Sequence, residues 1–579
     1  LAAPRRAARV KLMATTILVG GMMLGGQAPA QTLPSGGQVV AGQAVIGNAG
    51  GRMVISQSSD KAIVNWTDFS IGQGGEVDFD NGSGATLNRV TGGNLSSLDG
   101  VLKATGSVYL INPNGVIIGK NGVVSVGGDF VASALDVSNA SFLSGGDLTF
   151  SGPSLASVVN LGKIGALGGD VALMAVDVRN GGEIDAANGT AGLIAGRNII
   201  MRDSSVDDGR FLVVTGGSDT AATNDGMIAA AAAELRAEGG NIYALAGNTE
   251  GVIRATGVAD KGGRIWLTAG EAGSTAVSGS ALTAGDGAGD GGAITVAGGQ
   301  VTVASDATLD ASATGAAGHG GAISVIADKA SGDLTFAGTA LAKGGERGGQ
   351  VETSGARVDF DGARVDTTAA GGRTGDWLID PYDLTVDAAA AATLSTNLDS
   401  SNVTLQTTAS GTAGPGVANA AGNGDITIAS GVSWSGANTL TLDAYRSINI
   451  NAPITVAGSG AVVLTTNDGG AGGDYSFGLQ SDGFHGSLDY TGSGGGLTIN
   501  GAAYTLLYSL SDLAGISNVN GDYALARTLD ASGAAYTDAV VGELSEYPDC
   551  LPKRRGALEA LSPPSENRGR PQQEPQAAN

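Results

Sequence analysis

Few residues in this chain have the types and spacings that could do chemistry. Asp78 and Asp80 stand two apart, which places both carboxyl groups on one face of a strand, whereas Asp207 and Asp208 are adjacent and would face opposite ways. Paired carboxylates can perform acid–base work on a polysaccharide. Neither pair has a nearby cluster of His or Arg, so the chain is predicted not to be an enzyme.

Metal chemistry has equally weak support. The chain contains 2 His, His319 and His485, which argues against His-based zinc sites repeated along it. The segment 469–474, Gly-Gly-Ala-Gly-Gly-Asp, resembles one unit of a calcium-binding nonapeptide array, but it occurs once and is followed by Ser476 where an apolar residue belongs. The similar segment 285–290 is interpreted as a solvated loop. We therefore expect no metal site and no cofactor.

A third pattern, Asn112-Pro113-Asn114-Gly115, consists of residue types that favour a tight turn. Pro in the second place pre-sets φ, Asn in the first caps the turn, and Gly in the fourth closes it, which predicts a type I β-turn. A plain structural turn and a binding motif both remain open at this point.

The composition indicates which elements must hold these residues. Gly accounts for 99 of 579 residues, charged residues for 15% and aromatic residues for 4%, while the hydrophobic share is 42%. A core of small aliphatic side chains, with many short strands and tight turns, is therefore expected. The 31 Lys and Arg against 55 Asp and Glu give a net charge of −24, which argues against nucleic acid as the main partner. Cys550 is the single cysteine, so no disulfide can form within the chain.

The first 30 residues have the pattern of a secretory signal peptide. Arg5, Arg6, Arg9 and Lys11 form a basic start, an uncharged apolar run follows from Leu12 to Gly26, and small residues precede a cleavage site between Ala30 and Gln31. The alternative is a membrane anchor, but a run of about 15 residues is shorter than the roughly 20 that span a bilayer. The exported chain is expected to have no stable membrane span. Because the first residue is Leu, the true start codon stays open.

Internal repeats organise the rest of the chain. Asn160–Ile164 aligns with Asn180–Ile184 at an offset of 20, and a Gly-Gly marker followed by alternating apolar residues begins at Gly239, Gly262, Gly291, Gly320 and Gly348. Such units cannot bury an apolar face alone and must stack on their neighbours.

Stacked units predict an all-β fold, a right-handed parallel β-helix with an N-terminal cap. An antiparallel sandwich array is the rival. Ile164 and Ile184 should share one interior stack, and Gly and Asn should occupy corners because they tolerate positive φ. Ala229–Ala237 is expected to form a short outer helix, because these residues favour helix.

The order of these patterns suggests five regions. They are a signal peptide (1–30), an N-terminal domain with the first turns of the β-helix (31–270), irregular Gly-rich turns (271–376), a C-terminal β-rich region (377–546) and a disordered tail (547–579). The tail has six Pro and no strand pattern.

The stretch Leu87–Gly119, LNRVTGGNLSSLDGVLKATGSVYLINPNGVIIG, closely resembles the N-terminal secretion domain of filamentous haemagglutinin-like exoproteins. Segments that begin at Asn65, Val126, Val158 and Ala233 are similar to the same domain in the same order, so the resemblance runs from about Leu33 to Gly270.

This resemblance implies two-partner secretion in a Gram-negative bacterium. The chain would pass the inner membrane by general export, and an outer-membrane β-barrel partner with periplasmic domains would recognise its N-terminal domain and thread it outside. The residues that it implies for this secretion motif are Asn88, Arg89, Val90, Asn112, Pro113, Asn114 and Gly115. Members of the family are adhesins, haemolysins or contact-dependent toxins.

Two functions from different classes are therefore open. The favoured one is a secreted or cell-surface adhesin without a catalytic site, which would bind a glycan or protein on a host or neighbouring cell. The other is a β-helical carbohydrate-active enzyme, a lyase or hydrolase, that shares the export domain. The pattern breaks near Tyr547, which suggests a truncated or frameshifted product and speaks against surface anchoring or toxin delivery. The receptor, and release as opposed to surface attachment, are not readable from the sequence.

Overall fold

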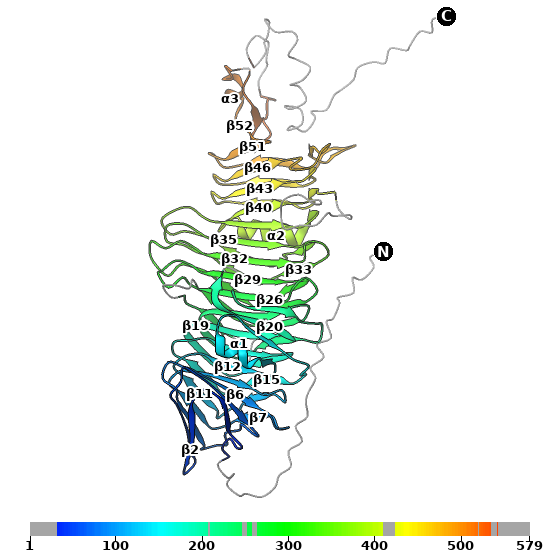
Figure 1. Ribbon diagram of the computed structural model, residues 1–579. Coiled ribbons are helices and arrows are strands. Elements are labelled where there is room, and N and C mark those ends of the chain that lie inside the picture. The colour runs from blue at the N-terminus through cyan, green and yellow to red at the C-terminus, as the bar shows by residue number, and fades with distance from the viewer. Residues whose placement is uncertain are drawn as a thin grey trace, which may run out of the picture.

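The computed structural model describes residues 32–206, 209–245, 252–257, 263–408, 423–518, 520–533 and 541. It is an elongated stack of short strands that begins at β2 and ends near β51 and β52 (Figure 1). The signal peptide with its cleavage site, Asp207 and Asp208, Cys550 and the 547–579 tail lie outside the described residues.

Three columns of strands, each hydrogen-bonded in parallel to the next turn, form three faces of a prism. Steps along each column are about one strand spacing, ~4.8 Å. The first face contains β3 (Arg52–Gln57), β5 (Glu76–Asp80), β8 (Val101–Ala104), β11 (Val123–Val126), β16 (Lys163–Ala166), the first parts of β19 (Glu183–Ala195) and β23 (Met227–Ala237), β25 (Val252–Ala255), β28 (Ala281–Ala284), β31 (Thr308–Asp310), β34 (Thr339–Leu341) and β37 (Arg364–Asp366).

The long strands β19 and β23 continue into the second face and join the two columns into one sheet. The other strands of the second face are β4 (Lys61–Trp66), β6 (Ala85–Val90), β9 (Ser107–Ile111), β12 (Phe130–Ser133), β17 (Val171–Ala175), β26 (Arg264–Thr268), β29 (Ala293–Gly298), β32 (Ala322–Ala327), β35 (Gln350–Ser354), β38 (Asp376–Asp380), β40 (Asn402–Gln406), β43 (Thr439–Asp443), β46 (Ala461–Thr465) and β51 (Gly496–Ile499). The third face consists of β7 (Ser96–Leu98), β10 (Val116–Ile118), β15 (Ser157–Asn160), β18 (Asp177–Asn180), β22 (Ala221–Asn224), β24 (Asn241–Leu245), β27 (Ser274–Ser278), β30 (Gln300–Val303), β33 (Asp333–Phe336) and β36 (Arg357–Asp359).

This arrangement confirms the predicted parallel β-helix. Alternate residues of each strand point inward, and they form one continuous core along the whole stack. Ile164 pairs in register with Ile184, and Ile184 pairs with Ile228, so the predicted interior stack is also confirmed. All three side chains are at most 1% exposed.

Antiparallel strands close the N-terminal end of the prism. β1 (Gln38–Ala41) pairs antiparallel with β4, and β2 (Ala44–Ala49) pairs antiparallel with β3. The first turn of the parallel stack is thereby covered on two of its faces. Covering matters because an open edge would leave unpaired backbone groups that invite association.

A second layer lies outside the helix. Val124 aligns with Ile164 and Ile184 aligns with Ile228, so two turns are about twice as long as their neighbours. The extra residues form α1 (Asn139–Ser144) and a four-stranded antiparallel sheet, which we call the outer sheet: β13 (Asp136–Val137), β14 (Leu148–Ser151), β20 (Asn198–Val206) and β21 (Gly209–Thr215).

The outer sheet has its own apolar core against the second face of the helix. Phe142, Phe150 and Phe211 from the insertions pack against outward-facing side chains such as Leu87 and Ile111. Burial of each such side chain contributes about 1.5–3 kcal/mol. The second face is therefore apolar on both sides in this part of the chain.

The predicted outer helix at Ala229–Ala237 is wrong. These residues belong to β23, which pairs with β19 on one side and with β25 and β26 on the other. Ala233 and Leu235 point into the core and Glu234 points outward under the outer sheet. Stacking of the neighbouring turns overrides the local helix propensity of an Ala-rich run.

The Gly-Gly marker has a different cause from the one expected. A Cβ at Gly292, Gly321 or Gly349 would lie 2.0–2.3 Å from the carbonyl oxygen of the matching glycine one turn earlier, and none of these residues has positive φ. Close approach of backbones thus requires glycine here. Among the described residues, Asn467 and Asn500 are the non-glycine residues with positive φ.

The marker at Gly239 belongs to another face. It leads into β24 of the third face, whereas those at Gly291, Gly320 and Gly348 lead into β29, β32 and β35 of the second face. The sequence repeat is therefore real, but its first copy does not align in space with the later ones.

Beyond β38 the prism changes its make-up. α2 (Ala388–Asn397) contacts β37 and β42, and smaller parallel sheets follow. The remaining elements are β39 (Leu384–Val386), β41 (Ile426–Ile428), β42 (Val432–Trp434), β44 (Ile448–Ile450), β45 (Pro453–Val456), β47 (Tyr475–Ser476), β48 (Leu479–Gln480), β49 (Gly483–Phe484), β50 (Ser487–Tyr490), β52 (Ala502–Leu507), α3 (Leu510–Ala514) and β53 (Tyr523–Leu525). In the part of the chain that the structure describes, no helix is long and apolar enough to cross a membrane.

Candidate functional site

The predicted turn at 112–115 lies between β9 and β10, at a corner of the prism. The backbone N–H of Gly115 donates to the carbonyl of Asn112 at 2.9 Å, which closes the turn as expected. The Asn112 side-chain oxygen accepts from the Asn114 N–H at 2.9 Å, and its Nδ2 donates to the Asn94 carbonyl and the Ser96 hydroxyl at 3.0 Å. Asn112 is fully buried, so its side chain ties the turn to the neighbouring turn of the helix.

Gly115 is fixed by two separate constraints. Its φ is 103°, and a Cβ at this position would lie 2.9 Å from the Ser157 carbonyl oxygen. A side chain at position 115 would therefore meet both backbone strain and a backbone contact.

The Asn88–Val90 segment of β6 splits between two layers. Asn88 and Val90 point inward and are at most 3% exposed, and the Asn88 Oδ1 accepts from the Trp66 indole N–H at 3.0 Å. Arg89 points outward and donates to Asp136 Oδ1 at 2.9 Å, Asn139 Oδ1 at 2.7 Å and the Val137 carbonyl at 2.7 Å.

These contacts give Arg89 a structural task. Its guanidinium joins the start of the outer sheet and of α1 to the second face of the helix. The side chain is 16% exposed, so most of it is held within this contact.

The exposed members of the predicted motif are Pro113 and Asn114. The flanking loops are bonded directly to them: Ser154 Oγ donates to the Pro113 carbonyl at 2.6 Å, and Asn114 Nδ2 donates to the Gly92 carbonyl at 2.9 Å. The same two loops carry Leu155 and Leu95, whose side chains are 69% and 45% exposed.

We call Leu95, Pro113, Asn114 and Leu155 the turn patch. It combines apolar side chains with an exposed amide at one corner of the stack. The two leucines were missed from the sequence, although Leu155 stands alone among polar and small residues in Ser-Gly-Pro-Ser-Leu-Ala-Ser and could have been noticed there. The structure thus separates five motif residues that are buried or held in the Arg89 clamp from two that are exposed, and it adds two leucines.

A polar cluster beneath the outer sheet was also missed. Arg210 Nε donates to Asp170 Oδ2 at 2.7 Å, and the Arg210 and Phe211 N–H groups donate to the carboxylate of the buried Glu234 at 2.6 and 3.2 Å. Tyr109 Oη bonds Asp129 Oδ2 at 3.2 Å. Tyr109, Asp129 and Arg210, together with Lys61 and Arg202, line a cavity of about 120 Å³.

Burial sets the proton affinities in this cluster. Removal from water raises the pKa of Asp129, and the nearby Asp170 carboxylate acts in the same direction. Burial likewise raises the pKa of Glu234, against the opposing effect of Arg236 and two backbone donors. Through Arg210 and Phe211, the cluster joins the outer sheet to Asp170 and Glu234 of the helix. It therefore holds two layers of one domain together.

One member of the candidate acid–base pair, Asp78 and Asp80, forms an ion pair with a neighbouring strand. Asp78 and Asp80 lie on the same face of β5, as expected, but Asp78 forms an ion pair with Arg52 of β3. Within the described residues, Arg52 is the titratable side chain that donates a hydrogen bond to this pair.

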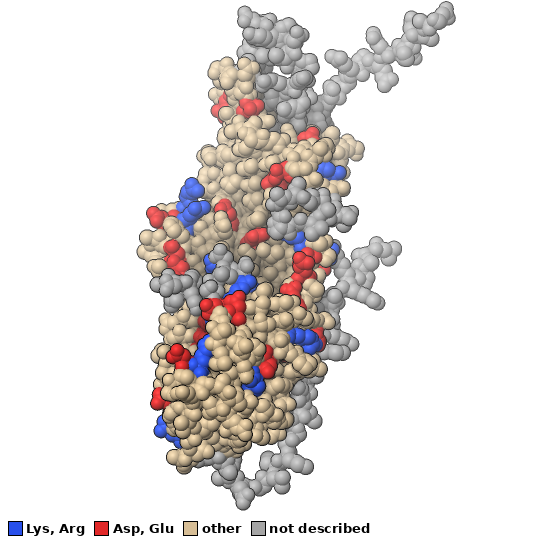
Figure 2. All heavy atoms as spheres, in the orientation of Figure 1, with Lys and Arg blue, Asp and Glu red and all other residues tan. Residues whose placement is uncertain are grey.

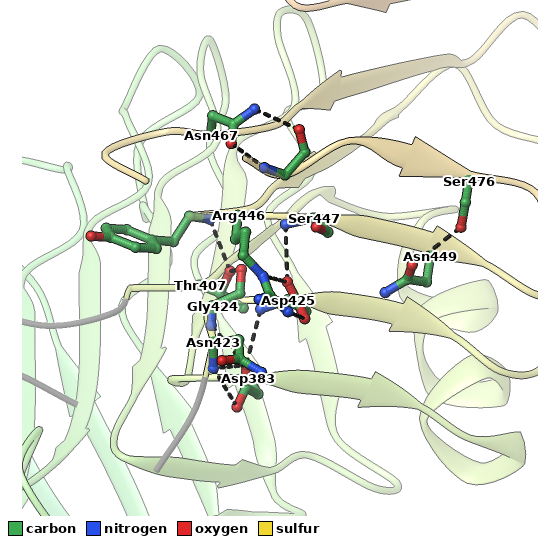
Figure 3. Close-up of polar contacts among 12 residues, drawn as sticks. Asp383, Thr407, Asn423, Gly424, Asp425, Arg446, Ser447, Asn449, Asn467 and Ser476 are labelled. Carbon is green, nitrogen blue, oxygen red and sulfur yellow. Dashed lines mark hydrogen bonds and ion pairs between the residues drawn. The ribbon is translucent and has the colours of Figure 1, made fainter. Parts of the chain in front are cut away.

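The loop that resembles a calcium-binding unit is closed by its own amide. Asn467 Oδ1 accepts from the Gly473 N–H at 2.7 Å, and Asn467 Nδ2 donates to the Gly473 carbonyl at 2.9 Å (Figure 3). One turn earlier, Asp425 pairs with Arg446, which lowers the pKa of the Asp425 carboxyl, and Asp383 accepts from the Gly424 N–H at 2.8 Å. These contacts are those of a corner that holds successive turns together.

The fold and the secretion-motif corner define a class of protein. Residues 30–280 match the family model of the TPS secretion domain, which is the match that the sequence resemblance predicted. Two-partner exoproteins are secreted across the outer membrane of Gram-negative bacteria.

Particular proteins are similar to this chain over limited lengths. A heme/hemopexin-binding protein of Haemophilus influenzae strain Rd is 36% identical over 256 residues, which is 42% of this chain and 28% of that protein. A second heme/hemopexin-binding protein of Haemophilus influenzae is 49% identical over 79 residues, 13% of this chain and 8% of that one. The crystal structure of the HMW1 secretion domain from Haemophilus influenzae is 29% identical, covers 60% of this chain and all of its own, and has a TM-score of 0.47.

Proposed function

We propose that this protein is a filamentous haemagglutinin-like adhesin that a two-partner (type Vb) system exports to the cell surface or the medium. An outer-membrane β-barrel transporter with periplasmic domains recognises its N-terminal domain. The match of residues 30–280 to the TPS secretion domain supports the pathway. The turn patch supports the mode of recognition, and it is the observation on which this proposal mainly rests.

The turn patch is suited to binding a partner because the buried residues beneath it fix its shape. Asn112, fully buried, holds the turn that presents Pro113 and Asn114, and Gly115 allows the chain to leave it. Exposed apolar groups beside a polar group at a rigid site are typical of protein interaction surfaces. Direct contact with the transporter is therefore assigned to Leu95, Pro113, Asn114 and Leu155, and support of their shape to Asn88, Arg89, Val90, Asn112 and Gly115.

The adhesive part of the proposal rests on the long stack beyond the secretion domain. Its outward surface is mostly uncharged, with scattered acidic and basic side chains on the face that Figure 2 shows. Binding of heme or hemopexin is not proposed, because the stretch shared with the two Haemophilus proteins covers 28% or less of either one. We also propose that the chain acts by binding rather than by catalysis.

Export of surface and buried variants tests the recognition step. The full chain is produced with its transporter, and the amounts in the medium and in the periplasm are compared. Leu155→Asp and Asn114→Ala should lower export at least fivefold while the purified chain keeps its circular dichroism and melting curve. Leu167→Asp is the matched control, because Leu167 is 77% exposed on a loop between β16 and β17.

Wild-type export of a Leu155→Asp/Asn114→Ala double variant would remove the turn patch from the mechanism. Adhesion is scored separately, as attachment of producing cells to epithelial and bacterial cell layers. Full export without any attachment would leave the pathway in place and overturn the adhesin.

A further inference from the structure

A cavity on the second face lies well beyond the secretion motif. It has a volume of about 560 Å³ and opens along the turns of β26, β29, β32 and β35. The outward side chains of Ala293, Ala322 and Gln350, each at the start of a strand, line it together with His319 and Arg347 from the loops that precede β32 and β35. Pockets of this size hold small ligands or part of a longer chain.

The glycines along this cavity are explained by packing, as shown for Gly292, Gly321 and Gly349, and are not evidence for a ligand. The evidence is the charge on the loops. Backbone bridges align His319 with Arg347 and Arg347 with Arg373, so three basic positions stand above one another on successive turns. Residues that follow one another along such a column are about one strand spacing, ~4.8 Å, apart.

Many basic side chains of this protein are paired with carboxylates. Arg179, Arg357 and Arg446 all pair with carboxylates, and acidic residues outnumber basic ones by 55 to 31. Arg347 and Arg373 are exposed and, within the described residues, form no ion pair. Like charges stacked in register repel each other, so an anionic ligand would stabilise this column.

Acidic groups also lie near this column, and one of them, Asp286, lines the cavity. One oxygen of Asp286 accepts from the N–H groups of Ala288, Gly289 and Asp290 at 2.8–2.9 Å. Asp290 Oδ1 accepts from the His319 N–H at 2.7 Å. These hydrogen bonds leave the charge on Asp286 and Asp290, and Glu346, next to Arg347, is exposed. The excess of positive charge is therefore confined to the two loops of Arg347 and Arg373, where two arginines stand against Glu346.

The outward side chains beside the cavity suit a carbohydrate. Trp266 is half-buried on β26, and the guanidinium groups of Arg236 and Arg264 lie 5.6 and 5.7 Å from its ring centroid. It is followed in register by Thr295, Ser324 and Glu352. An indole face with neighbouring hydroxyls and the Gln350 amide can contact both the apolar face and the hydroxyls of a sugar ring. An open trough over several turns fits an extended chain better than a compact ligand.

From these observations we propose that the trough binds an extended acidic polysaccharide, with its carboxylates on Arg347 and Arg373 and one sugar ring against Trp266. This deepens the proposed adhesive function by naming its ligand class. Single-stranded nucleic acid fits less well, because it relies on an aromatic platform for successive bases. Trp266 is the one aromatic residue among the outward side chains of β26, β29, β32 and β35.

Calorimetry on the purified full chain tests the proposal. The probes are hexasaccharides of galacturonate, mannuronate and hyaluronan, the methyl ester of the galacturonate hexamer, and a single-stranded DNA hexamer. At least one acidic hexasaccharide should bind, and Arg347→Gln with Arg373→Gln should weaken it at least tenfold. Arg357→Gln, an exposed arginine on the third face, is the matched control and should leave the affinity unchanged.

A second variant, Ala322→Trp, blocks the trough without changing its charge and should also weaken binding, with an unaltered circular dichroism spectrum. The proposal is overturned if no acidic hexasaccharide binds, if the double arginine variant binds as wild type does, or if the DNA binds more tightly than every sugar. Attachment of producing cells is measured in parallel. If attachment persists in the double arginine variant, cells attach without the trough. This result would overturn the assignment of the polysaccharide ligand to adhesion.

Discussion

Asn160 and Asn180 lie one turn apart with their side-chain amides joined, Asn160 Nδ2 donating to Asn180 Oδ1 at 2.8 Å. Asn180 Nδ2 donates in turn to Asn224 Oδ1 at 2.8 Å, although Asn224 is 44 residues further along the chain. All three residues are fully buried. The ladder therefore holds the register of the helix across the turn from which β20 and β21 leave the stack.

Breaking this ladder in the middle should loosen both neighbouring turns. Asn180→Ala leaves the Asn160 donor and the Asn224 acceptor without their partner, at about 1–3 kcal/mol for each group. Hydrogen exchange should accelerate in β15, β18 and β22. Asn188→Ala is the control, because Asn188 is exposed and its side chain donates to the Leu167 carbonyl. Equal exchange in the two variants would contradict the role of the ladder.

A carboxylate in the interior stack should be far more damaging. Ile184→Asp places an acid between Ile164 and Ile228, where nothing polar can pair with it, and should cost several kcal/mol. The variant is expected to lose its cooperative thermal transition in this part of the helix. Asp185→Ala changes the neighbouring outward residue and should melt close to wild type. A wild-type melting curve for Ile184→Asp would show that the register is wrong.

Removal of the Arg89 clamp should release the outer sheet and spare the helix. Arg89→Met keeps the aliphatic stem but loses three hydrogen bonds, to Asp136, Val137 and Asn139, worth about 2–4 kcal/mol together. Limited proteolysis should then cut within residues 134–150 first. The control is Arg52→Met, since Arg52 is a largely exposed arginine at the N-terminal cap. Unchanged cleavage in Arg89→Met would show that the Arg89 hydrogen bonds do not hold the outer sheet on the helix.

The stability around β43 should depend on pH through Asp443. Burial and the nearby Asp468 raise the pKa of Asp443 to about 6. The folded state thus binds this proton more tightly than the unfolded chain does. The stabilisation is complete below the unfolded pKa near 3.8 and is lost as the pH rises through about 6.

The size of this effect is on the order of 1 kcal/mol, because the group is partly exposed and screened. Hydrogen exchange in β43 should slow, after correction for the intrinsic rate, when the pH falls from 7.5 to 5. Asp443→Asn should flatten this dependence and slow exchange at pH 7.5. An unaltered pH dependence in Asp443→Asn would assign the effect to another group.

Several features could be predicted from the sequence because they repeat. The offset of 20 between Asn160 and Asn180 is the spacing that the structure pairs, and the alternation around Ile164 and Ile184 identifies the inward side of each strand. The turn at Asn112–Gly115 was readable because Pro fixes φ and Gly tolerates the positive φ at the end of the turn. Periodicity and turn chemistry are local properties, so they can be recognised without knowledge of the fold.

Other features were decided by the tertiary structure alone. The outer sheet is built from two insertions, and only the stacking of β17 and β19 beside β12 brings β14 and β20 together. The run Ala229–Ala237 has a helical composition, but pairing with β19 makes it a strand. The sequence does not show which of the side chains of Arg89 and Leu155 is exposed. Contacts with chain segments far away bury the first as a clamp and leave the second in the turn patch, because such contacts depend on how the turns stack.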